Sequence, residues 1–125
     1  MDEPRFHSIE QLRDALRRFS ADRDWDQFHS PKNLVMALIV EAGELVEHFQ
    51  WMSEQESAQL SETRLSEVRA EMADVFIYLV RLADRLGVDL LEAAAAKMAS
   101  NAQRYPATEF RGSSRKYSEL KTRDR

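Results

Sequence analysis

The chain has 125 residues and a formal net charge of −4, a length that fits a single domain. Its hydrophobic content of 43%, with only three glycines and three prolines, predicts an all-α protein with a real core. The chain has no cysteine, which excludes disulfides, thiolate metal sites and cysteine nucleophiles and is typical of a cytoplasmic protein.

Helix caps and hydrophobic spacing predict four helices. The first covers about residues 9–22, and Ser8 with Gln11 forms a capping box at its start. The second covers about residues 31–51, with Ser30 as its N-cap and proline at its first position.

The third predicted helix covers about residues 61–86 and ends at Gly87, a residue typical of helix C-caps. The fourth is capped by Asp89 with Glu92 and ends before Pro106. The third helix carries apolar residues that we expect to face the core: Val68, Met72, Val75, Leu79 and Leu82.

Four helices in a chain of this length predict a four-helix bundle. Ser53 with Glu56 caps a short turn between the second and third helices. Residues after Pro106 are expected to be irregular, so the predicted organisation is a helical domain over 1–110 and a basic arm over 111–125. We expect no signal peptide and no membrane span, because the N-terminus lacks an apolar core and no uncharged apolar run reaches ~18 residues.

Two pairs of acidic residues on the two central helices are the main functional signal. Glu41 and Glu44 are three residues apart, as are Glu71 and Asp74, so each pair shares one helix face. Glu41 falls on an apolar stripe, where an unpaired carboxylate is costly. If the helices run antiparallel, the four acids can converge, and a divalent cation relieves their repulsion.

Oxygen ligands of this kind favour Mg²⁺, with Mn²⁺ as an alternative, and Mg²⁺ commonly also binds substrate phosphates. The alternative is that both acid pairs are ordinary solvated helix residues, and spacing alone leaves the two readings open. A di-iron carboxylate site is disfavoured, since those bundles use Glu-x-x-His and the chain contains none.

These residues resemble the signature of the all-α nucleoside triphosphate pyrophosphohydrolases of the MazG-like superfamily. The segments "RDWDQFHSPKNL", "EAGELVEHFQW", "EMADVFIYLVRLA", "KMASNAQRYP" and "RGSSRKYSEL" are similar to the dCTP pyrophosphatase branch. The resemblance implies Mg²⁺-dependent hydrolysis of dCTP and modified dCTP to a monophosphate and pyrophosphate, in nucleotide-pool sanitation. It also implies a homo-oligomer, a dimer or a homotetramer.

The resemblance further implies roles for individual residues. Glu41, Glu44, Glu71 and Asp74 would hold the metal. Glu47 follows Glu44 by three residues, and this spacing makes it a candidate for steering or deprotonating the attacking water. The residues implied in substrate binding are Trp25, Gln27, His29, Trp51 and Tyr78 around the base, and Lys97, Asn101 and Arg104 near the phosphates. For each of them the alternative is an ordinary packing, capping or solvated role.

One position departs from the resemblance. Vertebrate members of the branch place a histidine on the first helix where this chain has Leu16, which can neither donate nor accept a hydrogen bond. The base preference is therefore open, and a pyrophosphohydrolase for dUTP or a broader set of triphosphates is the alternative. A non-catalytic helical protein whose basic tail binds nucleic acid is a third reading, although a solvated or subunit-clasping tail is favoured.

Overall fold

The computed structural model describes residues 3–114, and every regular element in that range is helical, which confirms the predicted all-α class. The elements are α1 (Ile9–Asp22), a 3₁₀ helix η1 (Asp26–Phe28), α2 (Pro31–Glu47), α3 (Glu54–Ser57), α4 (Glu62–Leu86), α5 (Leu90–Arg104) and α6 (Ala107–Phe110). Contacts divide the chain into two units, Met1–Val88 and a second that begins at Asp89. Most of the predicted basic arm, residues 115–125, lies outside the described range. None of the described helices is both long enough and apolar enough to cross a membrane.

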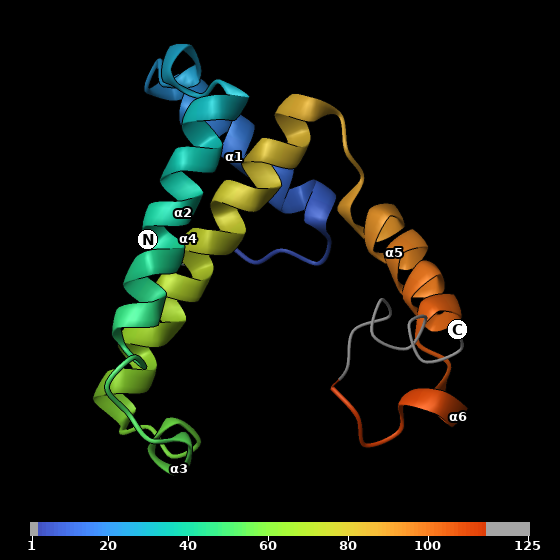
Figure 1. Ribbon diagram of the computed structural model, residues 1–125. Helices are drawn as coiled ribbons and strands as arrows, with labels where there is room; N and C mark the ends of the chain where they lie inside the picture. Colours follow the sequence, from blue (N-terminus) through green and yellow to red (C-terminus); the bar gives the residue numbers. More distant parts are fainter. Residues whose placement is uncertain (1–2, 115–125) are drawn as a thin grey trace. The chain divides into compact units, whose positions relative to one another are not determined.

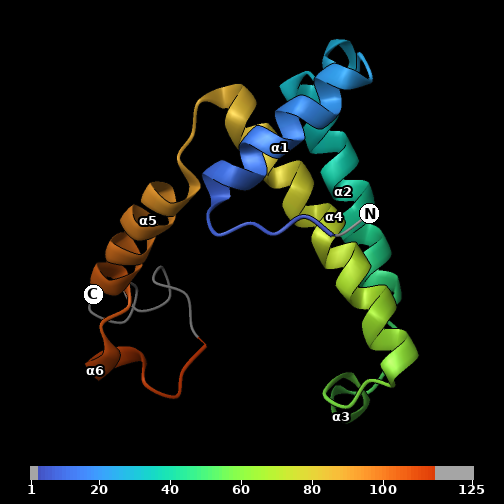
Figure 2. The same ribbon diagram turned by 180° about the vertical axis from the view of Figure 1, so that it is seen from behind.

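The first unit is built on the pair α2 and α4, which make the most contacts of any two elements. They run antiparallel and side by side, and α3 lies in the connection between them (Figure 1). Helix α1 packs against α4, as the reverse view also shows (Figure 2). This arrangement places the two acid-bearing helices against each other.

The start of α1 differs in detail from the predicted capping box. Ser8 Oγ accepts a hydrogen bond from the Gln11 backbone N–H at 3.1 Å, as expected. The Gln11 side chain, however, accepts from the His7 N–H at 2.8 Å and not from that of Ser8. The cap at Ser8 is therefore correct, and the reciprocal half of the box is displaced by one residue.

Helix α2 ends at Glu47, so the prediction that it continues to about Trp51 was wrong. After Glu47, two backbone hydrogen bonds span three residues and not four. The N–H of His48 donates to the carbonyl of Leu45, and that of Phe49 donates to the carbonyl of Val46. Three-residue bonds of this kind commonly close a helix. The predicted cap that follows is confirmed, because Ser53 and Glu56 form a complete capping box at α3.

The predicted ends of α4 are confirmed. Ser61 is the N-cap, and its side chain accepts from the Arg64 N–H at 3.1 Å. Gly87 is the C-cap in the left-handed conformation, with φ of 68°. A side chain there would be strained whatever the available space, which explains why glycine ends this helix.

In the second unit, α5 begins as predicted, with Asp89 Oδ1 accepting from the Glu92 N–H at 3.0 Å. The segment after Pro106 was expected to be irregular, and this was wrong for Ala107–Phe110, which forms α6. Phe110 packs edge-on against Tyr105, with ring centroids 4.9 Å apart. That aromatic contact across the proline accounts for the extra turn.

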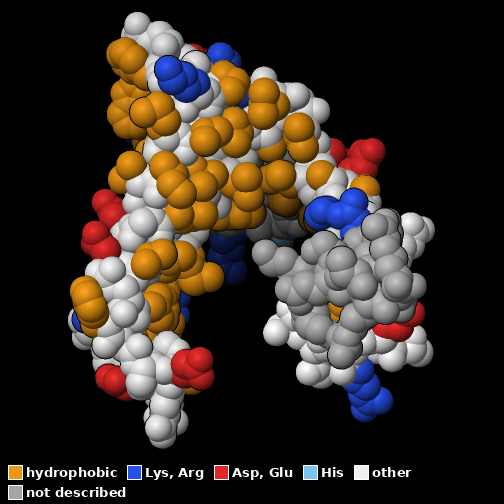
Figure 3. All heavy atoms as spheres, viewed as in Figure 1, with side chains coloured by type: hydrophobic (Ala, Val, Ile, Leu, Met, Phe, Trp, Pro, Cys, Tyr) orange, Lys and Arg blue, Asp and Glu red, His pale blue; other side chains and the backbone are white. Residues whose placement is uncertain are grey.

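Few side chains in the described range are fully buried. The buried apolar ones are Leu34, Val68, Val80 and Ala83. The expected core face of α4 was partly wrong, because Met72 is 58% exposed and Leu79 is 37% exposed. Apolar side chains instead gather on the surface over α2 and α4 (Figure 3).

Candidate active site

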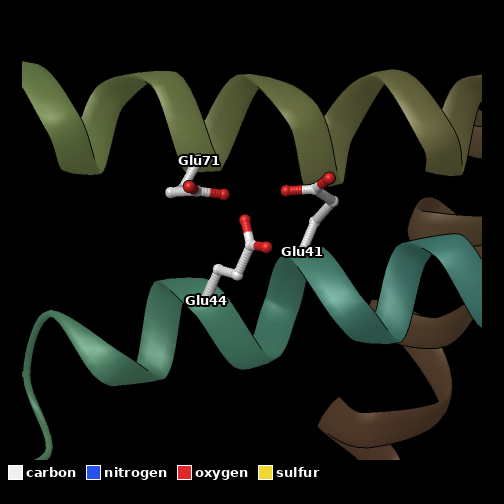
Figure 4. Close-up of side chains that lie close together, drawn as sticks. All are labelled: Glu41, Glu44 and Glu71. Atoms are coloured by element: carbon white, nitrogen blue, oxygen red, sulfur yellow. The ribbon is translucent and has the colours of Figure 1, made fainter.

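Three glutamates meet where α2 and α4 pack together. Glu41 and Glu44 lie on α2 and Glu71 on α4, and one carboxylate oxygen from each lies within 4.8 Å of the others. The side chains point toward one another across the helix pair (Figure 4). The antiparallel packing therefore brings Glu71 close to acids that lie 27 and 30 positions earlier in the chain.

Two atoms of this cluster are buried and have no hydrogen-bond partner among the described residues: Oε2 of Glu41 and Oε2 of Glu71. The pKa of Glu41 is raised to about 7, first by the adjoining carboxyl group of Glu71, then by burial and by its contact with Glu44. The charge of Asp74 raises the pKa of Glu41 further. Without a counter-charge, the cluster favours a protonated Glu41 near neutral pH.

The donor set fits a hard divalent cation. All three groups offer carboxylate oxygens, which suit Mg²⁺ or Mn²⁺ better than soft metals. The two unpaired carboxylate oxygens could coordinate a bound cation, and its charge would reduce the repulsion between the acids. Asp74 lies one turn beyond Glu71 and is exposed, outside the tight group of three but close enough for its charge to act on Glu41.

Beside the cluster lies a cavity of about 400 Å³, lined mostly by apolar side chains of α1 and α4. Asp74 is one of its lining residues, and Tyr78, one turn further along α4, is another. Trp25 and His29, which flank η1, also line it. Asp74 is therefore both a predicted metal ligand and a neighbour, in the cavity wall, of three predicted base-binding residues.

The walls of the cavity are held in place by local contacts. The Trp25 ring packs edge-on against Phe19, with centroids 5.7 Å apart, and against the His29 ring at 6.4 Å. Leu16, the position that departs from the family pattern, lies in the same wall. Gln27 does not line the cavity, and its amide nitrogen donates to the Asp24 carbonyl at 3.0 Å.

Two predicted residues lie apart from these groups. Glu47 is exposed, is the last residue of α2, and does not belong to the group of three acids. Trp51 lies in the turn between α2 and α3, is 89% exposed, and does not line the cavity that contains Trp25.

The predicted phosphate-binding residues belong to the second unit. Lys97, Asn101 and Arg104 are all exposed on α5. Their spacing of four and three residues places them on one face of that helix.

Sequence reasoning missed Arg81, which is only 5% exposed and lines the cavity. Its guanidinium donates to a carboxylate oxygen of Asp26 and, through Nε, to His29 Nδ1 at 3.2 Å. The available signal was an arginine inside the apolar run "VFIYLVRLA", a pattern that favours a buried, paired charge.

Comparisons with known proteins all point to one protein family. Residues 36–120 match the MazG-like family, a range that contains all four predicted acids. Human (Homo sapiens) dCTP pyrophosphatase 1 is 47% identical over 115 residues, or 90% of this chain and 68% of that protein. Its mouse (Mus musculus) counterpart is 45% identical over the same shares. The crystal structure of a pyrophosphatase from Archaeoglobus fulgidus superposes with a TM-score of 0.76 at 40% identity, covering 85% of this chain and 99% of the other.

Proposed function

The chain belongs to the MazG-like family, and from this membership we propose that it hydrolyses dCTP, including modified dCTP, to dCMP and pyrophosphate at a divalent-metal centre. The named relatives are dCTP pyrophosphatases and cover most of the chain. Such an activity removes unwanted nucleotides from the dNTP pool. A cytoplasmic location is part of the proposal.

One observation carries this proposal: Asp74 belongs both to the charged surroundings of Glu41 and to the wall of the apolar cavity. A nucleoside triphosphate has an anionic chain at one end and a flat base at the other. Acidic oxygens that suit a cation, next to a cavity lined by aromatic rings, match those two ends.

In this proposal, Glu41, Glu44, Glu71 and Asp74 hold Mg²⁺, with Mn²⁺ as a substitute. Bound Mg²⁺ supplies charge neutralisation at the phosphates and lowers the pKa of a coordinated water. The glutamates fix the site across α2 and α4, and Asp74 borders the base cavity. Glu47 remains the candidate for orienting or deprotonating the water, and this role rests on its position three residues after Glu44.

The base occupies the cavity between Trp25 and Tyr78, whose rings offer stacking surfaces. His29 is the polar group beside them, and Gln27 keeps a proposed role at the edge of the base. Trp51 is proposed as a further base-binding aromatic on the resemblance alone.

Lys97, Asn101 and Arg104 are proposed to bind the β and γ phosphates, because they share one face of α5 and carry donors. The proposed organisation keeps residues 1–110 as the catalytic helical domain and 111–125 as a basic arm. The proposed architecture is a four-helix bundle that assembles as a dimer or tetramer, and the exposed apolar side chains on α2 and α4 favour assembly.

A substrate panel tests the function. Purified protein is given dCTP, dUTP, dTTP and dATP in turn, with Mg²⁺ and with chelator, and pyrophosphate release is measured. We expect the highest kcat/KM with dCTP and no release without a divalent cation. Glu41→Gln, prepared in parallel, controls for contaminating hydrolases. If this variant released pyrophosphate from dCTP at the wild-type rate, the assignment of Glu41 to the active site would be wrong.

A broader specificity is the second candidate, because Leu16 lines the cavity and offers no hydrogen bond to a base. It predicts similar kcat/KM values for dCTP and dUTP. A non-catalytic helical protein predicts no metal-dependent release from any nucleotide, together with salt-sensitive DNA binding that is lost when residues 111–125 are removed.

A further inference from the structure

In the wall of the proposed base cavity, the buried guanidinium of Arg81 holds the imidazole of His29. Arg81 Nε donates to His29 Nδ1 at 3.2 Å, and Nη2 donates to Asp26 Oδ1. Nη1 lies 3.5 Å from a carboxylate oxygen of Asp84. These contacts join residues that are 52 and 55 positions apart in the chain, and Arg81 and His29 both line the cavity.

This contact fixes which ring nitrogen of His29 carries the proton. A guanidinium has donors and no acceptor, so Nδ1 must accept, and the neutral ring then carries its proton on Nε2. Burial, and after it the charge of Arg81, lower the pKa of His29. Asp26 raises that pKa and Arg85 lowers it, and both are weaker influences. The ring is therefore a neutral Nε2–H donor.

The arginine itself is held by a chain of charged groups. Asp84, which contacts Arg81, also accepts two hydrogen bonds from Arg17 on α1, one of them 2.7 Å from Nε. The Asp84 side chain is only 10% exposed and that of Arg81 6%. A guanidinium paired on several sides has little freedom to turn, so its hold on His29 is preorganised.

Building on the proposed function, we propose that Arg81 is a positioning residue for base recognition: it sets His29 as an Nε2–H donor that reads N3 of cytosine. In cytosine N3 is an acceptor, whereas in uracil and thymine the same atom carries a hydrogen. A fixed donor therefore pairs with cytosine and opposes the other two. Because the cavity walls are mostly apolar, an unmatched donor there is penalised.

The tautomer can be measured without any substrate. The ¹⁵N chemical shifts of the imidazole nitrogens show which one is protonated, and the chain has only three histidines. His29→Phe assigns the signal. In the wild-type protein near neutral pH we expect the proton on Nε2, and in Arg81→Lys, which keeps the charge but lacks the Nε–H, a mixture of tautomers.

Arg85→Lys is the matched control, since it makes the same change one turn further along α4 at an exposed side chain. It should leave the His29 signals unchanged. A wild-type proton on Nδ1, or an Arg81→Lys spectrum identical to wild type, overturns the assignment whatever the enzyme's activity.

The reading of N3 is tested with 3-deaza-dCTP, in which a C–H replaces N3 and the rest of the base is kept. The wild-type enzyme should prefer dCTP by about tenfold in kcat/KM, mainly through KM, as expected for one lost hydrogen bond. His29→Phe should lose this preference, and His29→Gln, whose amide nitrogen reaches the position of Nε2, should restore part of it.

The outcomes separate the two proposals. Turnover of dCTP and 3-deaza-dCTP with equal kcat/KM by the wild-type enzyme overturns the reading of N3 while leaving the hydrolase intact. No turnover of dCTP overturns the proposed function and, with it, the reading of N3. The ¹⁵N measurement then still decides the arginine's effect on the histidine.

Discussion

At the scale of single residues, Glu41 shows how an unfavourable position can indicate function. It follows an apolar run on α2, and the structure places one of its oxygens in a buried position without a partner. Its neighbours Glu44 and Glu71 are acids as well. Like charges held together at a partly buried site lower the stability there, which supports the proposal that the site binds a cation.

The first prediction concerns Glu41→Gln. In the metal-free protein we expect the variant to be the more stable at pH 8, by roughly 1 kcal/mol for a cluster partly screened by solvent. The folded-state pKa of Glu41 is raised to about 7 from an ordinary value of 4.5, so the folded wild-type protein binds the additional proton. Wild-type stability should therefore fall as pH rises from about 4.5 through 7.

Urea unfolding with a chelator, at pH 5 and pH 8, measures this difference. The advantage of Glu41→Gln should be present at pH 8 and nearly absent at pH 5. Added Mg²⁺ should raise the Tm of the wild-type protein much more than that of the variant, and kcat should drop roughly a hundredfold or more in the variant. If Mg²⁺ raised the Tm of both proteins equally, Glu41 would not be a metal ligand.

A second prediction compares the two tryptophans. Trp25 lines the cavity and Trp51 does not, although both resemble base-binding residues of the family. Trp25→Ala should raise the KM for dCTP by roughly tenfold with a smaller effect on kcat, because stacking on one aromatic ring is worth ~1–3 kcal/mol.

Trp51→Ala, measured in the same assay, tests the role proposed from resemblance. Both variants should keep the Mg²⁺-dependent rise in Tm, since neither residue belongs to the acid cluster. An unchanged KM in Trp25→Ala would mean that the base does not bind in this cavity.

The sequence predicted the acids at this scale but not the arginine in the cavity wall. The spacing of Glu41 with Glu44 is local and can be read from helix periodicity. The partners of Arg81 lie more than fifty positions away, and no periodic pattern connects them. Such networks depend on tertiary packing, which sequence spacing does not encode.

At the scale of elements, helix ends marked by a specific cap were predictable and ends without one were not. Gly87 and Asp89 are caps with a local physical cause, and both stand where they were expected. The end of α2 at Glu47 has no such marker, because apolar and aromatic residues continue past it. Only the change in backbone hydrogen bonding shows where that helix stops.

Gly87 supports a third prediction, with Gly43 as its matched control. Among the described residues, no atom beyond the adjacent residues and the helix's own backbone lies within 4 Å of a Cβ built at either glycine, so packing does not distinguish them. Gly87 has φ of 68°, so alanine should cost about 1 kcal/mol of unfolding free energy through backbone strain. Gly43 is inside α2, where alanine should instead stabilise the protein by roughly 0.5–1 kcal/mol.

Chemical denaturation of both variants gives the two values under identical conditions. The sign of the effect matters more than its size, because the same substitution is expected to act in opposite directions. If both variants were stabilised, the left-handed C-cap of α4 would not be formed in solution.

At the scale of the whole molecule, the described chain exposes more large apolar side chains than it buries. On α2 the exposed set is Val35, Met36, Ile39, Val40 and Val46. Their spacing of three, four and seven residues forms a continuous stripe over much of the helix. The helix boundaries could be predicted from local signals, but which stripe faces outward depends on how the helices pack.

A surface of this kind predicts self-association, since monomeric soluble proteins rarely expose large contiguous apolar patches. Ile39 is 64% exposed in the middle of the stripe. Light scattering after size exclusion should give a dimer or tetramer for the wild-type protein, and Ile39→Glu should shift it to smaller species with a lower Tm. The reason is that a carboxylate buried in an apolar interface has no partner.

Gln55→Glu is the control, because it adds the same charge at an exposed position on α3, away from the α2 stripe. It should leave the assembly unchanged. A wild-type protein that is monomeric at micromolar concentration, or an Ile39→Glu variant of unchanged size, would show that this stripe is not a subunit interface.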